Sequence, residues 1–197
     1  MTRTIVDAAA AIRDGEAVIY PTETVYGLGA DALDPAAIDR VYELKGRSRD
    51  NPLSVAVPDI PTALEYVAAT ERDRAFMQAF LPGPVTVICE ATPAIPRELT
   101  AGRDRVGIRI PDHDLALELL EEVAPITATS ANRSGTGSVT HPSDLDAELH
   151  EAVAVVIDDG ETPGTESTVV DPGRNEIHRR GAMAGAVDAW LQDQGRE

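Results

Sequence analysis

Three basic residues stand close together in the stretch Glu-Leu-Lys-Gly-Arg-Ser-Arg-Asp-Asn-Pro-Leu, namely Lys45, Arg47 and Arg49. Lys45 is the only lysine of the chain, because all the other basic residues are arginines. An ammonium group is a compact point charge that suits a phosphate, whereas a guanidinium is a planar fork that binds two oxygens at once. The cluster therefore predicts an anion site; the alternative is that these charges are solvated or pair with nearby acids.

Further arginines lie in three other short segments beside glycine, proline, serine or asparagine. These residues are Arg103, Arg105 and Arg109, then Arg133, and finally Arg179 with Arg180. Loops of small residues let arginine side chains converge on a ligand, so we expect several of these segments to meet at one site.

Hydroxyl and amide side chains lie at the ends of three predicted strands. Thr22 and Thr24 follow the first, Ser130 and Asn132 lie in a Ser/Gly/Thr-rich loop, 129–140, that follows another, and Ser167 stands at the start of a later strand. Open α/β sheets place ligands at strand ends, where small residues let backbone N–H groups approach phosphate or carboxylate oxygens. Each segment alone could equally be an ordinary turn or cap.

The charge balance limits what the anion can be. The 197 residues include 34 acidic and 17 basic ones, for a formal net charge of −17. This field opposes nucleic-acid binding, whose affinity comes mainly from basic contacts with phosphates. An acidic, lysine-poor surface indicates halophilic adaptation to a salty cytoplasm, although an acidic protein of an ordinary cytoplasm is the alternative.

The chain lacks the apolar segments that would place it at a membrane or outside the cell. Its longest apolar runs are too short to cross a bilayer, and its first residues lack the apolar region of a secretory signal. The single cysteine, Cys89, excludes an intramolecular disulfide. We therefore expect a cytoplasmic protein without a membrane partner.

Familiar ligand-binding motifs fit poorly. The stretch from Gly27 to Ala30 lacks the third glycine of a dinucleotide fingerprint, and no glycine-rich run precedes Lys45 as a phosphate-binding loop would require. No Gly-x-Ser-x-Gly elbow occurs. The four histidines and Cys89 show no metal-ligand spacing, so we expect no protein-bound metal.

The elements that must position these residues alternate along the chain. Helices are predicted over 4–14, 35–45, 61–68, 71–80, from a cap at Asp112 to about 122, over 143–149 and from about 185. Strands are predicted over 17–20, 53–57, 84–90, 105–110, 125–128, 153–157, 167–170 and near 175–179. Interleaved strands and helices predict an α/β fold, and the short last strand indicates a mixed sheet.

Six ordered motifs together resemble a known family. They are Pro-Thr-Glu-Thr-Val-Tyr-Gly-Leu-Gly, Lys-Gly-Arg-x-x-x-Asn-Pro-Leu, Pro-Gly-Pro-Val-Thr, Val-Gly-Ile-Arg-Ile-Pro, Ser-Ala-Asn-x-Ser-Gly and Glu-Ser-Thr-Val-Val-Asp. They closely resemble the YrdC-like L-threonylcarbamoyladenylate synthases and span about 15–181 of a predicted single domain, 1–197. The resemblance implies a twisted α/β sheet flanked by helices, with a concave ligand cavity.

The same resemblance implies a reaction. L-threonine, bicarbonate and ATP give threonylcarbamoyl-AMP and pyrophosphate, and a separate transferase uses the product to modify adenosine in tRNA. Magnesium is expected on the triphosphate, held mainly by phosphate oxygens and water.

Site residues follow from the resemblance, motif by motif. Lys45 and Arg47 are expected to be catalytic, through contacts with the phosphates. The implied ATP-binding residues are Lys45, Arg47, Asn51, Arg105, Asn132, Thr140 and Arg179. The implied L-threonine-binding residues are Thr24, Arg109, Ser130 and Ser167, with the Arg109 fork suited to the substrate carboxylate.

Three positions depart from the family pattern. Ala56 stands where many relatives carry a histidine that contacts threonine, and Arg105 stands where a serine or threonine usually contacts ATP. Arg180 replaces the proline of a terminal Arg-Pro-Gly. The first departure concerns the amino-acid pocket; Arg105 could either strengthen phosphate binding or face solvent.

Two other functions have been considered for this fold. One is a double-stranded RNA-binding module, which the net charge of −17 disfavours, so direct stable tRNA binding is not expected. The other is carbamoyl transfer in hydrogenase maturation, whose enzymes carry additional zinc-finger and acylphosphatase-like segments that do not fit in 197 residues with one cysteine.

Overall fold

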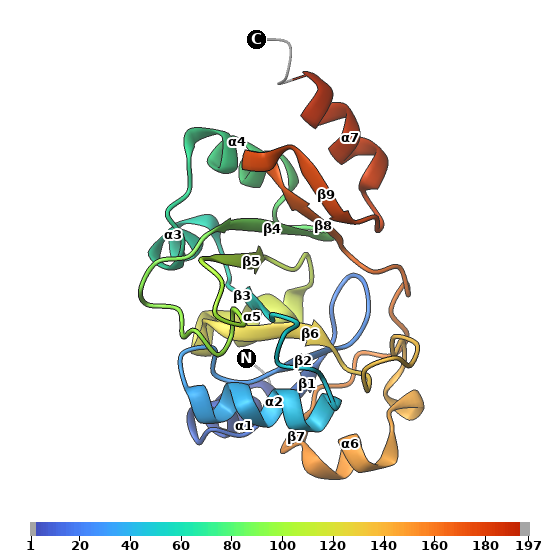
Figure 1. The fold of residues 1–197 in the computed structure, drawn as a ribbon. Coiled ribbons are helices and arrows are strands. Elements are labelled where there is room, and N and C mark those ends of the chain that lie inside the picture. The colour runs from blue at the N-terminus through green and yellow to red at the C-terminus, as the bar shows by residue number, and fades with distance from the viewer. Residues whose placement is uncertain (1–2, 194–197) are drawn as a thin grey trace.

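The computed structural model describes residues 3–193. Its strands are β1 (Val18–Tyr20), β2 (Gly27–Gly29), β3 (Ser54–Ala56), β4 (Val85–Glu90), β5 (Arg105–Arg109), β6 (Ile126–Ser130), β7 (Val155–Val156), β8 (Thr168–Asp171) and β9 (Glu176–Arg179). They form one sheet in the order β7-β1-β2-β6-β3-β5-β4-β8-β9 (Figure 1).

The sheet is twisted and mixed. β1 with β7, β3 with β5 and β4 with β8 are parallel, and the remaining neighbours are antiparallel. The final antiparallel strand β9 returns beside β8, as the short segment near 175–179 predicted. The predicted fold class is confirmed.

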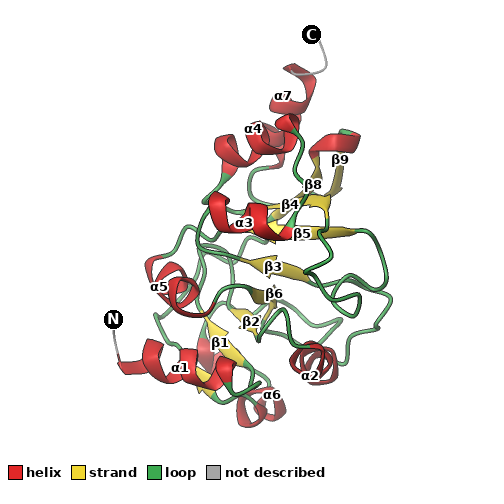
Figure 2. Ribbon diagram, turned by 90° about the vertical axis from the view of Figure 1, so that its left-hand side faces the viewer, coloured by secondary structure: helices red, strands yellow, loops and turns green. Residues whose placement is uncertain are grey.

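Helices lie on both sides of the strands (Figure 2). They are α1 (Arg3–Arg13), α2 (Pro35–Lys45), α3 (Ile60–Tyr66), α4 (Glu71–Phe80), α5 (Asp114–Val123), α6 (Ala147–Ala152) and α7 (Ala184–Asp193), with short 3-10 helices at Pro142–Asp144 and Pro172–Arg174. None of the helices within residues 3–193 is both long and apolar enough to pass through a membrane.

Alternating strand residues divide the core into two clusters. Val18, Tyr20 and Ala56 pack with helices α1 and α5 in the smaller cluster. Ile19 and Val55, their immediate neighbours, belong to the larger cluster that includes residues of α2, α3 and α4. Because successive strand side chains point to opposite faces, the two clusters mark the two faces of the sheet.

Strand β2 was absent from the elements predicted by sequence. Gly-Leu-Gly has low strand propensity and resembles a turn. Glycine nevertheless suits position 27, because a Cβ there would lie 2.8 Å from the ring of buried Tyr20 on the paired strand β1. Close packing of Tyr20 over a glycine strand is a tertiary constraint that local propensity does not contain.

Two helix starts also differ from the prediction. The helix expected over 143–149 begins only at Ala147, because the Asp146 side chain caps it by accepting from the Leu149 N–H at 3.2 Å. The segment before it is a 3-10 turn started by Pro142. Helix α5 has His113, not Asp112, at its N-cap, and His113 makes no side-chain capping bond.

Candidate functional site

A cavity of about 690 Å³ opens on the sheet face that carries the smaller core cluster. Ser54 lines the cavity two residues from Ala56, and Ala128 lines it two residues from Ile126. Side chains two apart on a strand share a face. The cavity is therefore the part of this face that α1 and α5 leave uncovered.

Small side chains form much of the cavity floor. Gly27, Ser54, Thr86, Gly107 and Ala128 come from five strands, β2 to β6, and all line the space. Their neighbours Leu28, Val55, Val85, Val87, Val106 and Ile108 are buried in the larger core cluster. Most of the bulky residues of these strands therefore face the core, and the cavity receives mainly small or polar ones, with Ile88 of β4 as an exception.

The cavity wall carries an excess of positive charge. Its arginines are Arg47, Arg103, Arg105, Arg109, Arg174 and Arg179, and its acidic residues are Asp104, Glu166 and Asp171. In a chain with a net charge of −17, this local concentration of guanidinium groups makes the cavity the candidate anion site. Several basic segments of the sequence do meet here, as predicted.

Arg109 anchors one end of the cavity and is 8% exposed. Its Nη2 donates to Thr24 Oγ1 at 2.8 Å and to Glu23 Oε2 at 3.0 Å. The Thr22 hydroxyl donates to the Val25 carbonyl at 2.7 Å and lies 2.8 Å from the Thr24 hydroxyl. Because the Thr22 proton is already used, Thr24 donates to Thr22, and the chain of hydrogen bonds fixes the Thr24 hydroxyl.

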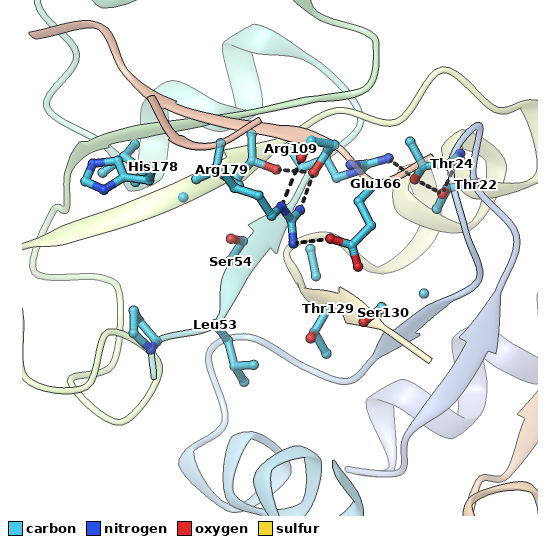
Figure 3. Close-up of a pocket in the computed structure, with 18 of the residues that line it drawn as sticks. Thr22, Thr24, Leu53, Ser54, Arg109, Thr129, Ser130, Glu166, His178 and Arg179 are labelled. Carbon is cyan, nitrogen blue, oxygen red and sulfur yellow. Dashed lines mark hydrogen bonds and ion pairs between the residues drawn. The ribbon is translucent and has the colours of Figure 1, made fainter. Parts of the chain in front are cut away.

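Arg179 reaches into the cavity from β9, with Glu166 beside it (Figure 3). Its Nη2 donates to Ser167 Oγ at 2.9 Å, its Nε donates to the Ser167 carbonyl at 3.1 Å, and its Nη1 lies 3.0 Å from Glu166 Oε2. Ser167 Oγ also lies 3.1 Å from Thr86 Oγ1. Arg179 and Ser167 are thereby held as one unit across β8 and β9.

Lys45 stands at the C-terminal end of α2, as predicted, because Gly46 ends the helix in a left-handed conformation with φ of 56°. Its side chain is 2% exposed, and Nζ donates to the Asn132 carbonyl at 2.6 Å and to the Ser130 carbonyl. Lys45 itself does not line the cavity, whereas Ser130 does. The ammonium therefore lies outside the cavity and fixes the end of β6, which forms part of the cavity wall.

Burial changes the pKa of this ammonium group. Desolvation, with a smaller effect from the positive charge of Arg47, lowers the pKa of Lys45 from 10.5 to about 8, against an opposing effect of Glu166. Between these two values the folded protein binds fewer protons at Lys45 than the unfolded chain does. The free energy of unfolding therefore rises with pH across that window, and below it the buried charge opposes folding.

Arg47 lines the cavity and also braces the segment that follows it. Its Nε donates to the Asn51 carbonyl and its Nη2 to the Pro52 carbonyl, both at 3.0 Å. Burial lowers the pKa of Arg47, and the nearby charge of Arg179 lowers it further. The two arginines therefore share one region of positive potential.

The structure places the remaining predicted residues in different surroundings. Asn51, Asn132 and Thr140 do not line the cavity. The Asn132 amide donates to the carbonyls of Arg133 and Thr136, at 2.9 and 2.8 Å, and so folds the loop that follows β6. The Thr140 carbonyl accepts from the Thr162 N–H at 2.8 Å, which joins that loop to the segment before β8.

Two of the three positions that depart from the family pattern lie at or near the cavity. Arg105 lines the cavity, but its Nη2 donates to buried Asp171 at 2.7 Å and to the Ile88 carbonyl at 3.0 Å, so its charge is already paired. Ala56 is fully buried in the cluster with α1 and α5 and does not line the cavity.

Several lining residues were not predicted, notably Ser54, Thr86, Glu166 and His178, whereas Thr22 was singled out with Thr24 by its place after a strand. Glu166 lies next to predicted Ser167, and the two-residue period of the strands could have identified Ser54 and Thr86. Within residues 3–193, no group of three histidine, cysteine or acidic residues is arranged to hold a metal ion.

Comparisons with known proteins agree on one family. The model of the Sua5/YciO/YrdC family, described as "Telomere recombination", matches residues 10–181. The threonylcarbamoyl-AMP synthase of Pyrococcus abyssi is 44% identical over 168 residues, covering 83% of this chain and 49% of that protein. The Bacillus subtilis threonylcarbamoyl-AMP synthase is 44% identical over 170 residues, covering 84% and 49% respectively.

A solved structure shows the same arrangement of elements. The crystal structure of Pyrococcus abyssi Sua5 complexed with L-threonine is 41% identical and superposes with a TM-score of 0.83, covering 90% of this chain and 54% of that one. This chain therefore spans about half the length of the curated relatives that it matches.

The lowered pKa of Lys45 can be tested directly, because the chain has only one lysine. Labelling lysine with ¹³C at Cε gives one resonance to follow by NMR. We expect its shift to titrate with a midpoint at about pH 8 in the folded protein. The same sample unfolded in urea should titrate near the ordinary value, about 10.4. A folded midpoint near that value would contradict the buried position of the ammonium.

Proposed function

The chain belongs to the Sua5/YciO/YrdC family, and on that premise we propose that it converts L-threonine, bicarbonate and ATP into threonylcarbamoyl-AMP and pyrophosphate. The observation that carries the proposal is the cavity itself. It combines a buried arginine beside a fixed threonine hydroxyl with further basic residues, Arg47 and Arg179 among them.

L-threonine would occupy the end formed by Thr24, Arg109, Ser130 and Ser167. One Arg109 nitrogen, Nη2, carries both hydrogen bonds to Glu23 and Thr24, so other donors of the guanidinium are available for a carboxylate. The hydroxyls of Ser130 and Ser167 border the same space and can bind the amine or the side-chain hydroxyl. The crystallised Pyrococcus abyssi relative binds L-threonine, which supports this choice of substrate.

ATP, as its magnesium complex, would bind with its phosphates at the basic end. Arg47 and Arg179 face the cavity and are the direct candidates for phosphate contacts. Lys45, which does not line the cavity, would act indirectly, because its ammonium holds the backbone carbonyls of Ser130 and Asn132 at the end of β6. Asn132 and Thr140 would shape the loop around the nucleotide, and Asn51 would hold Arg47. The magnesium ion would remain coordinated by phosphate oxygens and water.

The reaction needs little acid–base machinery. The amine of L-threonine captures carbon dioxide from bicarbonate as a carbamate, and a carbamate oxygen attacks the α-phosphorus as pyrophosphate leaves. Holding the two reactants in line and neutralising the phosphate charge supplies most of the rate enhancement. A pocket of fixed hydroxyls and arginines suits that task.

The product would be released for use by a separate transferase that modifies tRNA. The acidic surface makes a direct, stable complex with tRNA unfavourable, so the enzyme is preferred over an RNA-binding module. A cytoplasmic location would bring the enzyme together with its substrates.

Pyrophosphate release tests the proposed activity. We expect release from ATP to require L-threonine and bicarbonate together, because the nucleophile forms only from both. A coupled phosphate assay with each component omitted in turn measures this requirement. Pyrophosphate release that is indifferent to L-threonine would contradict the proposed reaction.

Replacing Arg109 with lysine tests the threonine end. A lysine keeps the charge beside Glu23 but loses the planar fork. We expect the KM for L-threonine to rise about tenfold or more, and the KM for ATP to change little.

The control for Arg109→Lys is Arg13→Lys. Arg13 pairs with Glu122 at the surface, away from the cavity. An unchanged KM for L-threonine in Arg109→Lys would mean that Arg109 does not bind the substrate carboxylate.

A further inference from the structure

Glu166 places a carboxylate inside an otherwise basic part of the cavity. Its Oε2 lies 3.0 Å from Arg179 Nη1, and its Oε1 accepts from the Ser138 hydroxyl at 2.6 Å. Figure 3 shows the Glu166 side chain meeting the Arg179 guanidinium within the cavity. One residue thus joins β9 to the loop that follows β6.

The cations around Glu166 are those that would bind the phosphates. Arg179 is its direct partner, and Arg47 lies close enough to Arg179 for the two charges to affect each other. The negative charge of Glu166 also acts on Lys45. A carboxylate and a phosphate oxygen make similar demands on these donors, so the two would compete for the same hydrogen bonds.

The main chain at Glu166 is fixed, whereas its side chain can move. The Glu166 carbonyl accepts from the Ala182 N–H at 3.0 Å, and a Cβ placed on Gly181 would lie only 2.2 Å from the Glu166 carbonyl oxygen. The Glu166 side chain, in contrast, is 41% exposed, and Arg179 is 47% exposed. An ion pair this accessible is weak, so rotation of the side chain can release it without any change in the fold.

We propose that the Glu166 carboxylate competes with a phosphate group of the nucleotide for Arg179, and that it rotates away when the nucleotide binds. This inference rests on the proposed function. Glu166 would hold Arg179 in place when no phosphate is present. By competing for Arg179 it would also weaken the binding of pyrophosphate and so favour release of that product.

Two other roles for Glu166 predict different results. A carboxylate that coordinates the magnesium ion would strengthen the binding of magnesium pyrophosphate, so its loss would weaken that binding. A carboxylate that only positions Arg179 would strengthen binding whether or not magnesium is present. Among these three roles, competition is the one in which removing the negative charge makes pyrophosphate bind more tightly.

The test is calorimetric titration of the whole protein with pyrophosphate, with and without Mg²⁺, at constant ionic strength. Glu166→Gln removes the charge and keeps the shape. The matched control is Glu161→Gln, an exposed position five residues earlier that does not line the cavity. We expect Glu166→Gln to lower the Kd for pyrophosphate about fivefold or more in both conditions, and Glu161→Gln to leave it unchanged. Adenosine, which has no phosphate, should bind wild type and Glu166→Gln alike.

Unchanged or weaker pyrophosphate binding in Glu166→Gln would overturn the inference, and weakening seen only with Mg²⁺ would assign Glu166 to the metal. These results leave the proposed function standing. If the wild-type protein binds neither ATP nor pyrophosphate, the proposed function fails, and the inference fails with it.

Discussion

The buried ammonium of Lys45 lies between the carbonyls of Ser130 and Asn132, and this contact joins the end of α2 to the end of β6. A slender ammonium can enter such a space and donate in several directions, whereas a guanidinium needs a planar set of partners. That difference explains why a chain whose other basic residues are all arginines keeps a lysine here. The contact has an energetic cost, because a buried charge opposes folding at neutral pH. In return, the buried lysine orders the end of β6, where Ser130 lines the cavity.

The rest of the site depends on how the sheet divides its side chains. Bulky residues such as Val55, Val106 and Ile108 face the larger core, and small or polar residues face the cavity. Helices α1 and α5 cover only part of that second face. The uncovered part forms the cavity, and both Arg109 and Arg179 line it. Local positive charge attracts anions there despite the acidic surface, and salt would weaken the opposing field of that surface.

The sequence predicted the fold class, most element positions and seven cavity-lining residues, because strand and helix periodicity and the ordered motifs are local signals. It did not predict β2, whose glycines are explained only by Tyr20 packing across them. It also could not show that Lys45 points to backbone carbonyls, or that Arg105 is paired with Asp171, because both partners are distant in the chain. The salt adaptation indicated by composition stays a prediction.

The proposed reaction requires one cavity to join L-threonine, bicarbonate and ATP. It can be followed by mass spectrometry of the nucleotide products after incubation with ¹³C-bicarbonate, L-threonine and ATP. We expect a threonylcarbamoyl-AMP species that carries the ¹³C label and is missing when D-threonine replaces L-threonine. AMP or ADP formation without a labelled threonyl adduct would contradict it.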